Sequence, residues 1–202
     1  MTSEDFNSGE YWQHRYQKGR DSGDGSYGRL AEYKANFLNE FIAANNILSI
    51  IEFGCGDGAQ LDLARYPRYI GVDIAPAAIE ICQRSFVDDY TKCFVGYNLL
   101  QDLPPQEVSL SLDVIFHLVE DSVFEKYIRD LFNWASRYVI IYSSDRDEIP
   151  LSPHVRHRRF THWIEENIVG WKLLKHELNP YPQDERHPED TSFADFYIYA
   201  RV

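Results

Sequence analysis

The sequence predicts an α/β protein with an open, mostly parallel sheet and helices on both faces. Short apolar runs alternate along the chain with stretches whose apolar residues recur at helical spacing. The runs at 47–53 and 137–142 lack the polar alternation of a half-exposed strand, which is typical of strands buried on both faces. Repeated strand and helix units of this kind favour parallel strands joined by crossover helices.

Length and composition fit a single folded domain. The chain has 202 residues, of which 44% are hydrophobic and 15% aromatic, more buriable surface than a disordered chain carries. We expect one domain over residues 1–202, with an N-terminal lid segment at 1–28 and a core at 29–202. The lid segment is polar and aromatic, has glycines among Ser and Asp residues, and is predicted to be a loop.

The first half of the core is predicted to alternate between helices and strands. Its first helix ends before Asn45 and Asn46, and Pro76 fits the first turn of a later helix. In order, the expected elements are a helix at 30–44, a strand at 47–53, a helix at 59–65, a strand at 69–72, a helix at 76–85 and a strand at 92–95.

The second half continues the alternation and ends in two strands. The last strand alternates apolar and polar residues, as a strand with one exposed face does. The expected elements are a strand at 108–112, a helix at 122–135, a strand at 137–142, a helix at 161–167 and strands at 171–178 and 193–201.

Charge and cysteine content exclude several classes of partner. There are 20 Lys and Arg against 32 Asp and Glu, a net charge of −12, which repels phosphate backbones and anionic membranes. The apolar runs are far shorter than the roughly 20 residues that span a bilayer. Cys55, Cys82 and Cys93 lack the paired spacing of a disulfide framework or zinc site. We expect a cytoplasmic protein with a small-molecule substrate, no nucleic-acid or membrane partner, and an oligomeric state that the sequence leaves open.

The first predicted strand runs into a glycine turn, EFGCGDG at 52–58. Glycines let backbone N–H groups approach a ligand closely, and ligands of open α/β sheets bind at the carboxyl ends of the strands. Asp73 ends the second strand and is placed to accept hydrogen bonds from ribose hydroxyls. The third glycine comes two residues after the second, not three, and Glu52 would oppose a pyrophosphate. An adenosine ligand with a cationic group is therefore favoured over NAD.

With these residues the chain resembles the class I S-adenosylmethionine (SAM)-dependent methyltransferases over roughly residues 11–202. The resemblance implies a Rossmann-like sheet of seven strands that ends in an antiparallel hairpin, formed by the strands at 171–178 and 193–201. It implies SAM as the cofactor and S-adenosylhomocysteine (SAH) as its product. The cofactor residues that it implies are Glu52, Gly54, Cys55, Gly56 and Asp73, with Ile74 packed against adenine. Independently of the resemblance, Tyr27 of the lid segment is expected to fold over the cofactor, because a cation attracts aromatic faces.

One position departs from the family pattern. Many members have an acidic residue just after the third strand that contacts the adenine amino group, whereas this chain reads GYNL at 96–99. We expect Asn98 or a backbone carbonyl to take that role.

The segment LSLDVIFH at 110–117 resembles the family's fourth-strand motif, which lies near the donor methyl group. Asp113 and His117 would share a helical face there, and His117 has the unperturbed pKa that suits removal of the acceptor's proton. The alternative is a helix-capping Asp and a core His. Asp113 and Asp145 also offer oxygen ligands that Mg²⁺ prefers, although we predict no metal.

A basic run and an aromatic segment are the candidate substrate contacts. Arg156, His157 and Arg159 follow the fifth strand, and Arg presents a bidentate fork to a carboxylate, so we predict that they bind an acidic group. The alternative is a solvated loop. Tyr16 and Trp12 are predicted to cover the site, where a cation attracts aromatic faces, or else to anchor an N-terminal helix.

The sequence thus predicts SAM-dependent methyl transfer to an O or N atom of a small, acidic, soluble acceptor. Two alternatives stay open: a cofactor-binding module without catalysis, and a methyltransferase that acts on a protein side chain. A closed pocket under the lid segment would favour a small acceptor, and an open groove a polymer.

Overall fold

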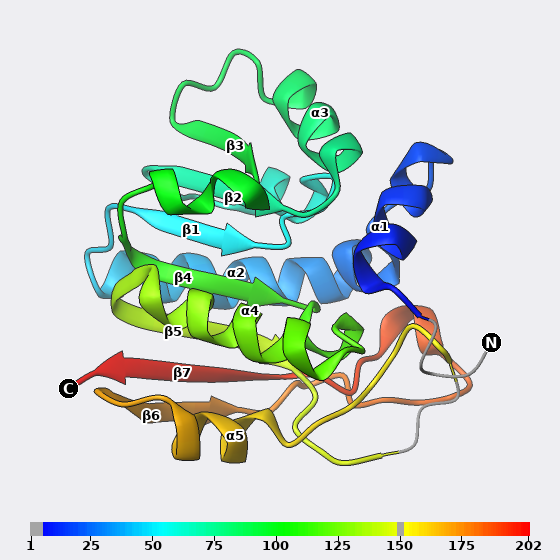
Figure 1. Cartoon of the computed structure of the whole chain (residues 1–202), viewed down its shortest axis with the longest axis vertical. Coiled ribbons are helices and arrows are strands. Elements are labelled where there is room, and N and C mark those ends of the chain that lie inside the picture. The colour runs from blue at the N-terminus through cyan, green and yellow to red at the C-terminus, as the bar shows by residue number, and fades with distance from the viewer. Residues whose placement is uncertain (1–5, 149–151) are drawn as a thin grey trace.

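The computed structural model describes residues 6–148 and 152–202. At its centre is a seven-stranded sheet in the order β3-β2-β1-β4-β5-β7-β6 (Figure 1). Strands β1 to β5 pair in parallel, and β7 is antiparallel to both of its neighbours, β5 and β6. The predicted open, mostly parallel sheet with an antiparallel C-terminal hairpin is confirmed. The strands are β1 (Ile50–Phe53), β2 (Tyr69–Asp73), β3 (Lys92–Gly96), β4 (Gln106–Leu112), β5 (Ala135–Ser143), β6 (Trp171–Glu177) and β7 (Asp195–Arg201).

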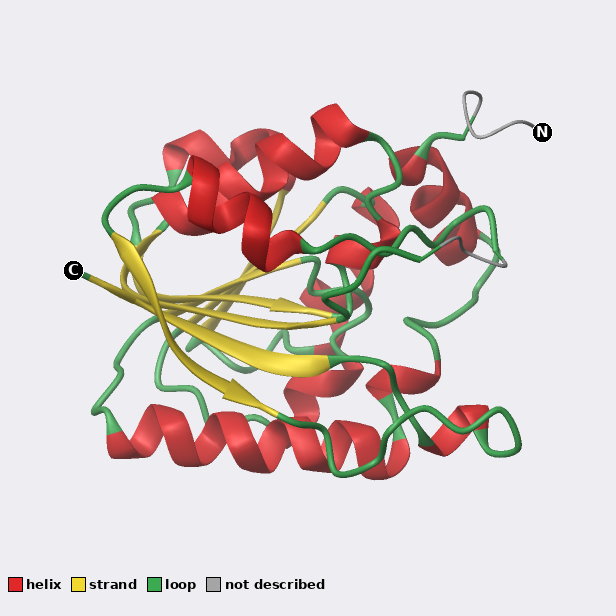
Figure 2. Ribbon diagram, turned by 90° about the horizontal axis from the view of Figure 1, so that it is seen from below, coloured by secondary structure: helices red, strands yellow, loops and turns green. Residues whose placement is uncertain are grey.

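Helices cover both faces of the sheet (Figure 2). Side chains of α2 and α3 belong to the core on one face, and those of α4 and α5 to the core on the other. The helices are α1 (Ser8–Gln17), α2 (Gly28–Ala44), α3 (Pro76–Ser85), α4 (Asp121–Asn133) and α5 (Phe160–Asn167), with short 3₁₀ turns at Asp24–Ser26, Ala59–Leu63, Tyr97–Asp102, Ile115–His117 and Pro188–Asp190.

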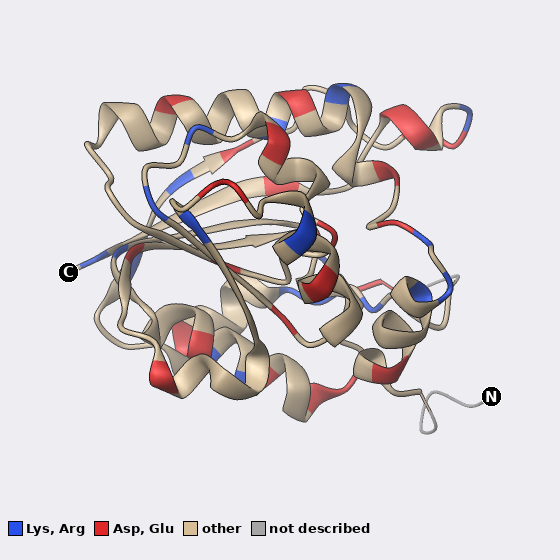
Figure 3. Ribbon diagram, turned by 90° about the horizontal axis from the view of Figure 1, so that it is seen from above, with Lys and Arg blue, Asp and Glu red and all other residues tan. Residues whose placement is uncertain are grey.

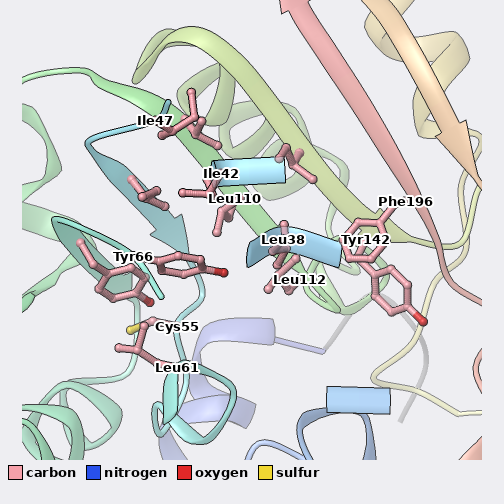
Figure 4. Packing of buried hydrophobic residues seen from close by; sticks show 14 of the residues in the cluster. Leu38, Ile42, Ile47, Cys55, Leu61, Tyr66, Leu110, Leu112, Tyr142 and Phe196 are labelled. Carbon is pink, nitrogen blue, oxygen red and sulfur yellow. The ribbon is translucent and has the colours of Figure 1, made fainter. Parts of the chain in front are cut away.

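The α2 face has a continuous apolar core. Figure 4 shows Leu38 and Ile42 of α2 among Leu110 and Leu112 of β4 and Phe196 of β7. These side chains are buried, and complete burial of each such side chain contributes about 1.5–3 kcal/mol. The core therefore packs α2 against β4 and β7.

The opposite face of β4 carries two buried serines. Ser109 Oγ donates to the Leu131 carbonyl of α4 at 2.6 Å, and Ser111 Oγ accepts from the Tyr127 hydroxyl at 2.8 Å. Because each buried hydroxyl has a partner, these polar residues are accommodated inside the sheet and align α4 along it.

The structure differs from the sequence prediction at the N-terminus. Residues 1–28 are predicted to be a loop, but α1 occupies Ser8–Gln17. The side chain of Asn7 caps this helix by accepting from the Glu10 N–H at 2.9 Å. The helix at 59–65 is also shorter than predicted, a 3₁₀ turn at Ala59–Leu63.

Charged residues lie on the elements all around the sheet, with acidic and basic positions interspersed on the face that Figure 3 displays. None of the helices within residues 6–148 and 152–202 combines the length and apolar composition that a bilayer crossing needs.

Candidate active site

The glycine turn after β1 lies at the carboxyl edge of the sheet. Gly54 and Gly56 have φ of +80° and +58°, a region that favours glycine. A Cβ on Gly54 would come within 2.6 Å of Val114, and one on Gly56 would overlap the Ser22 side chain. Glycine is therefore required here by the close approach of other segments as well as by the backbone conformation.

Asp73 ends β2 and holds the glycine turn in place. Its carboxylate accepts from the Gly56 N–H at 3.0 Å and from the Ala75 N–H at 2.8 Å. The side chain is buried, and burial raises its pKa although these backbone N–H groups lower it. Each carboxylate oxygen retains a lone pair for a further donor, as the predicted ribose contact requires.

Glu52, the last acidic residue before the glycines, faces the same cavity. It is buried and accepts from the Tyr69 hydroxyl at 2.7 Å. Burial raises its pKa to about 7, and Tyr69 and Lys34 oppose that rise. This carboxyl group can therefore change its protonation near neutral pH, and a cationic ligand beside it would favour the charged form.

Lys34 of α2 lies at the other side of the glycine turn. It is 1% exposed, and its Nζ pairs with Asp113 at 2.6 Å and lies 5.3 Å from the ring centre of Tyr142. Asp113 follows β4 and has φ of +59°. Lys34 is a site residue that the sequence reasoning missed. The sequence signal for it is its place in the apolar stripe of the helix at 30–44. That stripe faces the core, so a lysine within it is expected to be buried and paired.

The lid segment is fastened to the glycine turn through Asp57. The Ser22 N–H and Oγ donate to the Asp57 carboxylate at 2.9 and 2.7 Å, and the Tyr27 hydroxyl donates to it at 3.1 Å. Ser22 Oγ also lies 3.0 Å from the Tyr16 hydroxyl. Asp57 therefore holds residues 16–27 of the lid segment against the glycine turn.

A second attachment fixes the start of α1. The Ser8 N–H donates to Glu120 at 2.9 Å, the Ser8 hydroxyl bonds the same carboxylate, and the Val119 N–H donates to Ser8 Oγ at 3.1 Å. Since Ser8 is buried, α1 is held at both ends across the carboxyl edge of the sheet.

His117 lies between β4 and α4 with its ring enclosed. Its Nδ1 is 2.9 Å from the His154 carbonyl, and the Trp12 ring packs edge-on at 4.9 Å between centroids. A carbonyl can only accept, so Nδ1 carries the proton and Nε2 a lone pair. Burial lowers the pKa of His117 to about 4. The ring is therefore neutral at physiological pH.

These groups line one cavity of about 450 Å³, which runs along the carboxyl edge between the lid segment and α4. Of the predicted residues it brings together Glu52, Gly54, Cys55, Gly56, Asp73, Ile74, Asp113, His117 and Tyr16. Residues that the sequence reasoning did not assign to the site also line it, among them Ser22, Lys34, Gln60, Tyr97, Ser122 and Lys126.

Two predicted cofactor residues do not line this cavity. The Tyr27 side chain is 43% exposed, and its hydroxyl donates a hydrogen bond to Asp57. The Asn98 side chain folds back toward Gly96, 2.6 Å from where a Cβ of that glycine would lie. Tyr97, one residue earlier, lines the cavity instead, because the chain enters a 3₁₀ turn directly after β3.

The basic run is engaged elsewhere, contrary to its predicted substrate role. Arg156 donates to the Val119 carbonyl at 2.8 Å and pairs with Asp121. His157 Nδ1 lies 2.7 Å from Ser144 Oγ, and Arg159 is exposed and outside the lining of the cavity. Asp121, at the acidic start of α4, pairs with Arg156 and Arg158, and the helix N-terminus favours a carboxylate at that place.

Asp113 and Asp145 do not form a paired carboxylate site. Asp113 pairs with Lys34, whereas Asp145 accepts from the N–H and hydroxyl of Thr161 at 3.0 and 2.6 Å and so caps α5.

No protein-family model and no curated protein matches the chain. Solved structures do match it in fold. Magnesium protoporphyrin IX methyltransferase from Synechocystis PCC 6803 with bound SAM is 16% identical, with a TM-score of 0.68 and 98% of each chain covered. The N-methyltransferase NodS from Bradyrhizobium japonicum WM9 in complex with SAH is 14% identical, with a TM-score of 0.72 over 97% of this chain and 99% of the other.

A third match covers only part of a larger protein. A small RNA methyltransferase is 14% identical, with a TM-score of 0.64 over 87% of this chain and 26% of its own. The fold is thus that of the class I SAM-dependent methyltransferases, and the resemblance drawn from the sequence is confirmed at the level of the fold.

Proposed function

We propose that this chain is a SAM-dependent methyltransferase. The observation that carries the proposal is Asp73, a buried carboxylate at the carboxyl end of β2 that is bonded to the glycine turn and faces a 450 Å³ cavity. That is where an open α/β sheet binds the ribose of a nucleotide. Structures of the same fold contain SAM or SAH.

The residues of the cavity fit each part of SAM. Asp73 is placed for the ribose hydroxyls, and Ile74, 55% exposed, offers an uncovered apolar side chain for the base. Glu52 suits the ammonium group, and Gln60 Oε1 is a buried acceptor without a partner in the part of the chain described. Lys34 suits the carboxylate, because its ammonium already lies in a buried ion pair that can be shared.

SAM supplies an electrophilic methyl group on a sulfonium. The work of this chain is then to orient the acceptor and keep water away. Trp12 and Tyr16 cover the cavity from α1. Helix α1 is fixed at Glu120 through Ser8 and, through the contact of Tyr16 with Ser22, at Asp57. Alignment of two bound reactants can contribute about 7–11 kcal/mol, so the reaction needs little further help.

His117 is suited to orient the acceptor more than to deprotonate it. Its Nε2 lone pair can accept a hydrogen bond from the acceptor, since Nδ1 is committed to the His154 carbonyl. With a pKa of about 4 the ring is a weak base. Asp113 shares its charge with Lys34 and is likewise a positioning group.

We propose a small acceptor methylated on O or N. The cover formed by α1 supports a small molecule over a protein side chain. The engagement of Arg156 with Asp121 removes the support for an acidic group on the acceptor. The free thiols of Cys55, Cys82 and Cys93 suit action in the cytoplasm.

Labelled methyl groups test the proposal. The protein is incubated with methyl-tritiated SAM and either the small-molecule fraction of a cell extract or its protein fraction. Label in small molecules is expected. Label in protein alone would favour the protein-side-chain alternative, and SAM binding without transfer to either fraction would favour a module without catalysis.

A further inference from the structure

The end of the cavity beyond β3 lacks the acidic residue that the family resemblance leads one to expect. Tyr97 is the first residue after β3 and lines the cavity, while Asn98 turns away toward Gly96. From α4, Ser122 and Lys126 line the same cavity. The polar groups that α4 and the turn after β3 supply here are thus three hydroxyls, of Tyr97, Ser122 and Tyr127, and one ammonium. The Tyr127 hydroxyl is already bonded to the Phe53 carbonyl and to Ser111.

The hydrogen bonds among these groups have a defined direction. The Tyr97 hydroxyl donates to Asp130, and Lys126 Nζ donates to Asp130 at 2.5 Å and to the Tyr97 oxygen at 3.3 Å. Burial, with the Asp130 carboxylate beside it, raises the pKa of Tyr97, so its hydroxyl keeps the proton that it donates. A lysine ammonium has three protons and no lone pair. One proton of Lys126 is therefore left for a ligand.

Topology places this end of the cavity beside the base. The sheet order runs β3-β2-β1-β4, so Tyr97 after β3 and Asp113 after β4 lie on opposite sides of Asp73. If Asp73 binds the ribose, the base points toward Tyr97 and Lys126, and the amino-acid part toward Lys34. This step rests on the proposed function.

We infer that Lys126, held in place by Tyr97 and Asp130, is a specificity-determining residue that recognises an acceptor atom of the purine base, so that binding does not depend on the exocyclic amino group. A ring nitrogen or a 6-oxo group satisfies the free proton of Lys126. An amino group, which donates, does not. Because the Lys126 side chain is 64% exposed, the expected effects are several-fold and not larger.

A pair of ligands distinguishes recognition of an acceptor atom by Lys126 from recognition of the exocyclic amino group. SAH and S-inosyl-L-homocysteine differ in the 6-amino and 6-oxo groups, and their dissociation constants are measured by calorimetry on the full chain. The values are expected to agree within about fivefold. Binding of the inosyl compound that is weaker by fivefold or more would overturn the inference. An amino group that the protein recognises contributes roughly one hydrogen bond to binding, and its replacement would cause a loss of that size. If neither ligand binds, the proposed function fails with it.

Variants test the residue itself. Lys126→Met keeps the length of the stem and removes the donor, and we expect about fivefold weaker binding of the inosyl compound. Lys92→Met is the matched control, because Lys92 also pairs with a nearby aspartate but lies outside the cavity. Unchanged binding of both ligands to Lys126→Met, with the fold intact by circular dichroism, would overturn the assignment.

Discussion

The two halves of the cavity are built differently. The half at the ends of β1 and β2 depends on contacts close in sequence, such as the bond between Gly56 and Asp73, 17 positions apart. The half between the end of β4 and the start of α4 depends on distant contacts: Lys34 meets Asp113 across 79 positions, and Ser8 meets Glu120 across 112. The bond that shapes the first half is local in sequence, whereas the second half exists only when the lid segment, α2 and β4 are assembled.

The buried ion pair of the second half should give the largest effect. Lys34→Met leaves Asp113 with a charge and no partner, and we expect a loss of about 3 kcal/mol in the free energy of unfolding. Urea unfolding measures it. Lys34→Met combined with Asp113→Asn removes both charges, keeps a residue that tolerates the positive φ of position 113, and should recover most of the loss. A double variant as unstable as the single one would contradict the role of this pair.

The glycine turn of the first half comes next. Gly56→Ala places a Cβ against Ser22 at a positive φ, and we expect a loss of about 2–3 kcal/mol together with loss of SAH binding. Gly170→Ala is the control, since Gly170 has φ of +82° but, apart from its chain neighbours, no atom of residues 6–148 and 152–202 lies within 4 Å of an added Cβ. It should lose only about 1 kcal/mol, the strain alone. Equal losses of unfolding free energy in the two variants would mean that the close approach of Ser22 to Gly56 does not contribute to stability.

The two halves should respond to pH in opposite directions. The pKa of Glu52 rises from 4.5 to about 7 on folding, so the folded state binds the extra proton and stability falls as pH rises from about 4.5 to 7. The pKa of His117 falls from 6.5 to about 4, so the unfolded state binds the extra proton and stability rises with pH between about 4 and 6.5.

Single variants separate these two dependences. Glu52→Gln should make stability climb more steeply between pH 5 and 7, and His117→Phe should make it climb less, each by on the order of 1–2 kcal/mol over that range. Unfolding free energies at several pH values measure both. Parallel pH profiles for wild type and variant would contradict the corresponding shift.

The anchor between the halves should give the smallest effect. Asp57→Asn loses part of its hold on Ser22 and Tyr27, and we expect SAH to dissociate about fivefold faster, a change of about 1 kcal/mol. Stopped-flow displacement measures the rate. Asp62→Asn, an exposed aspartate of the adjoining turn, is the control. The same rate in both variants would show that the lid segment does not retain the ligand.

The sequence predicted those parts of the site that depend on residues close to one another in the chain. Glu52, Gly56 and Asp73 could be placed because a buried strand, a glycine turn and an acid at the next strand end form one continuous segment. Lys34 could not be paired with Asp113, since nothing in the chain between them specifies the contact.

The same limit explains the misplaced basic run. Arg156 follows β5 as predicted, but whether it faces the cavity or Asp121 depends on where α4 begins. An N-terminal helix anchored by Trp12 and Tyr16 was only an alternative in the sequence analysis, because the one local signal for α1 is the Asn7 cap and its position is fixed by Glu120 far along the chain.

Titration of the protein with SAH, repeated with Asp73→Ala, tests the central claim most directly. Asp62→Ala serves as the matched control, and circular dichroism verifies that each variant is folded. We predict that wild type and Asp62→Ala bind alike and that Asp73→Ala binds at least tenfold more weakly, a change of about 1.4 kcal/mol. Equal binding by folded Asp73→Ala, or no binding by the wild type, would contradict the assignment of this cavity as a SAM site.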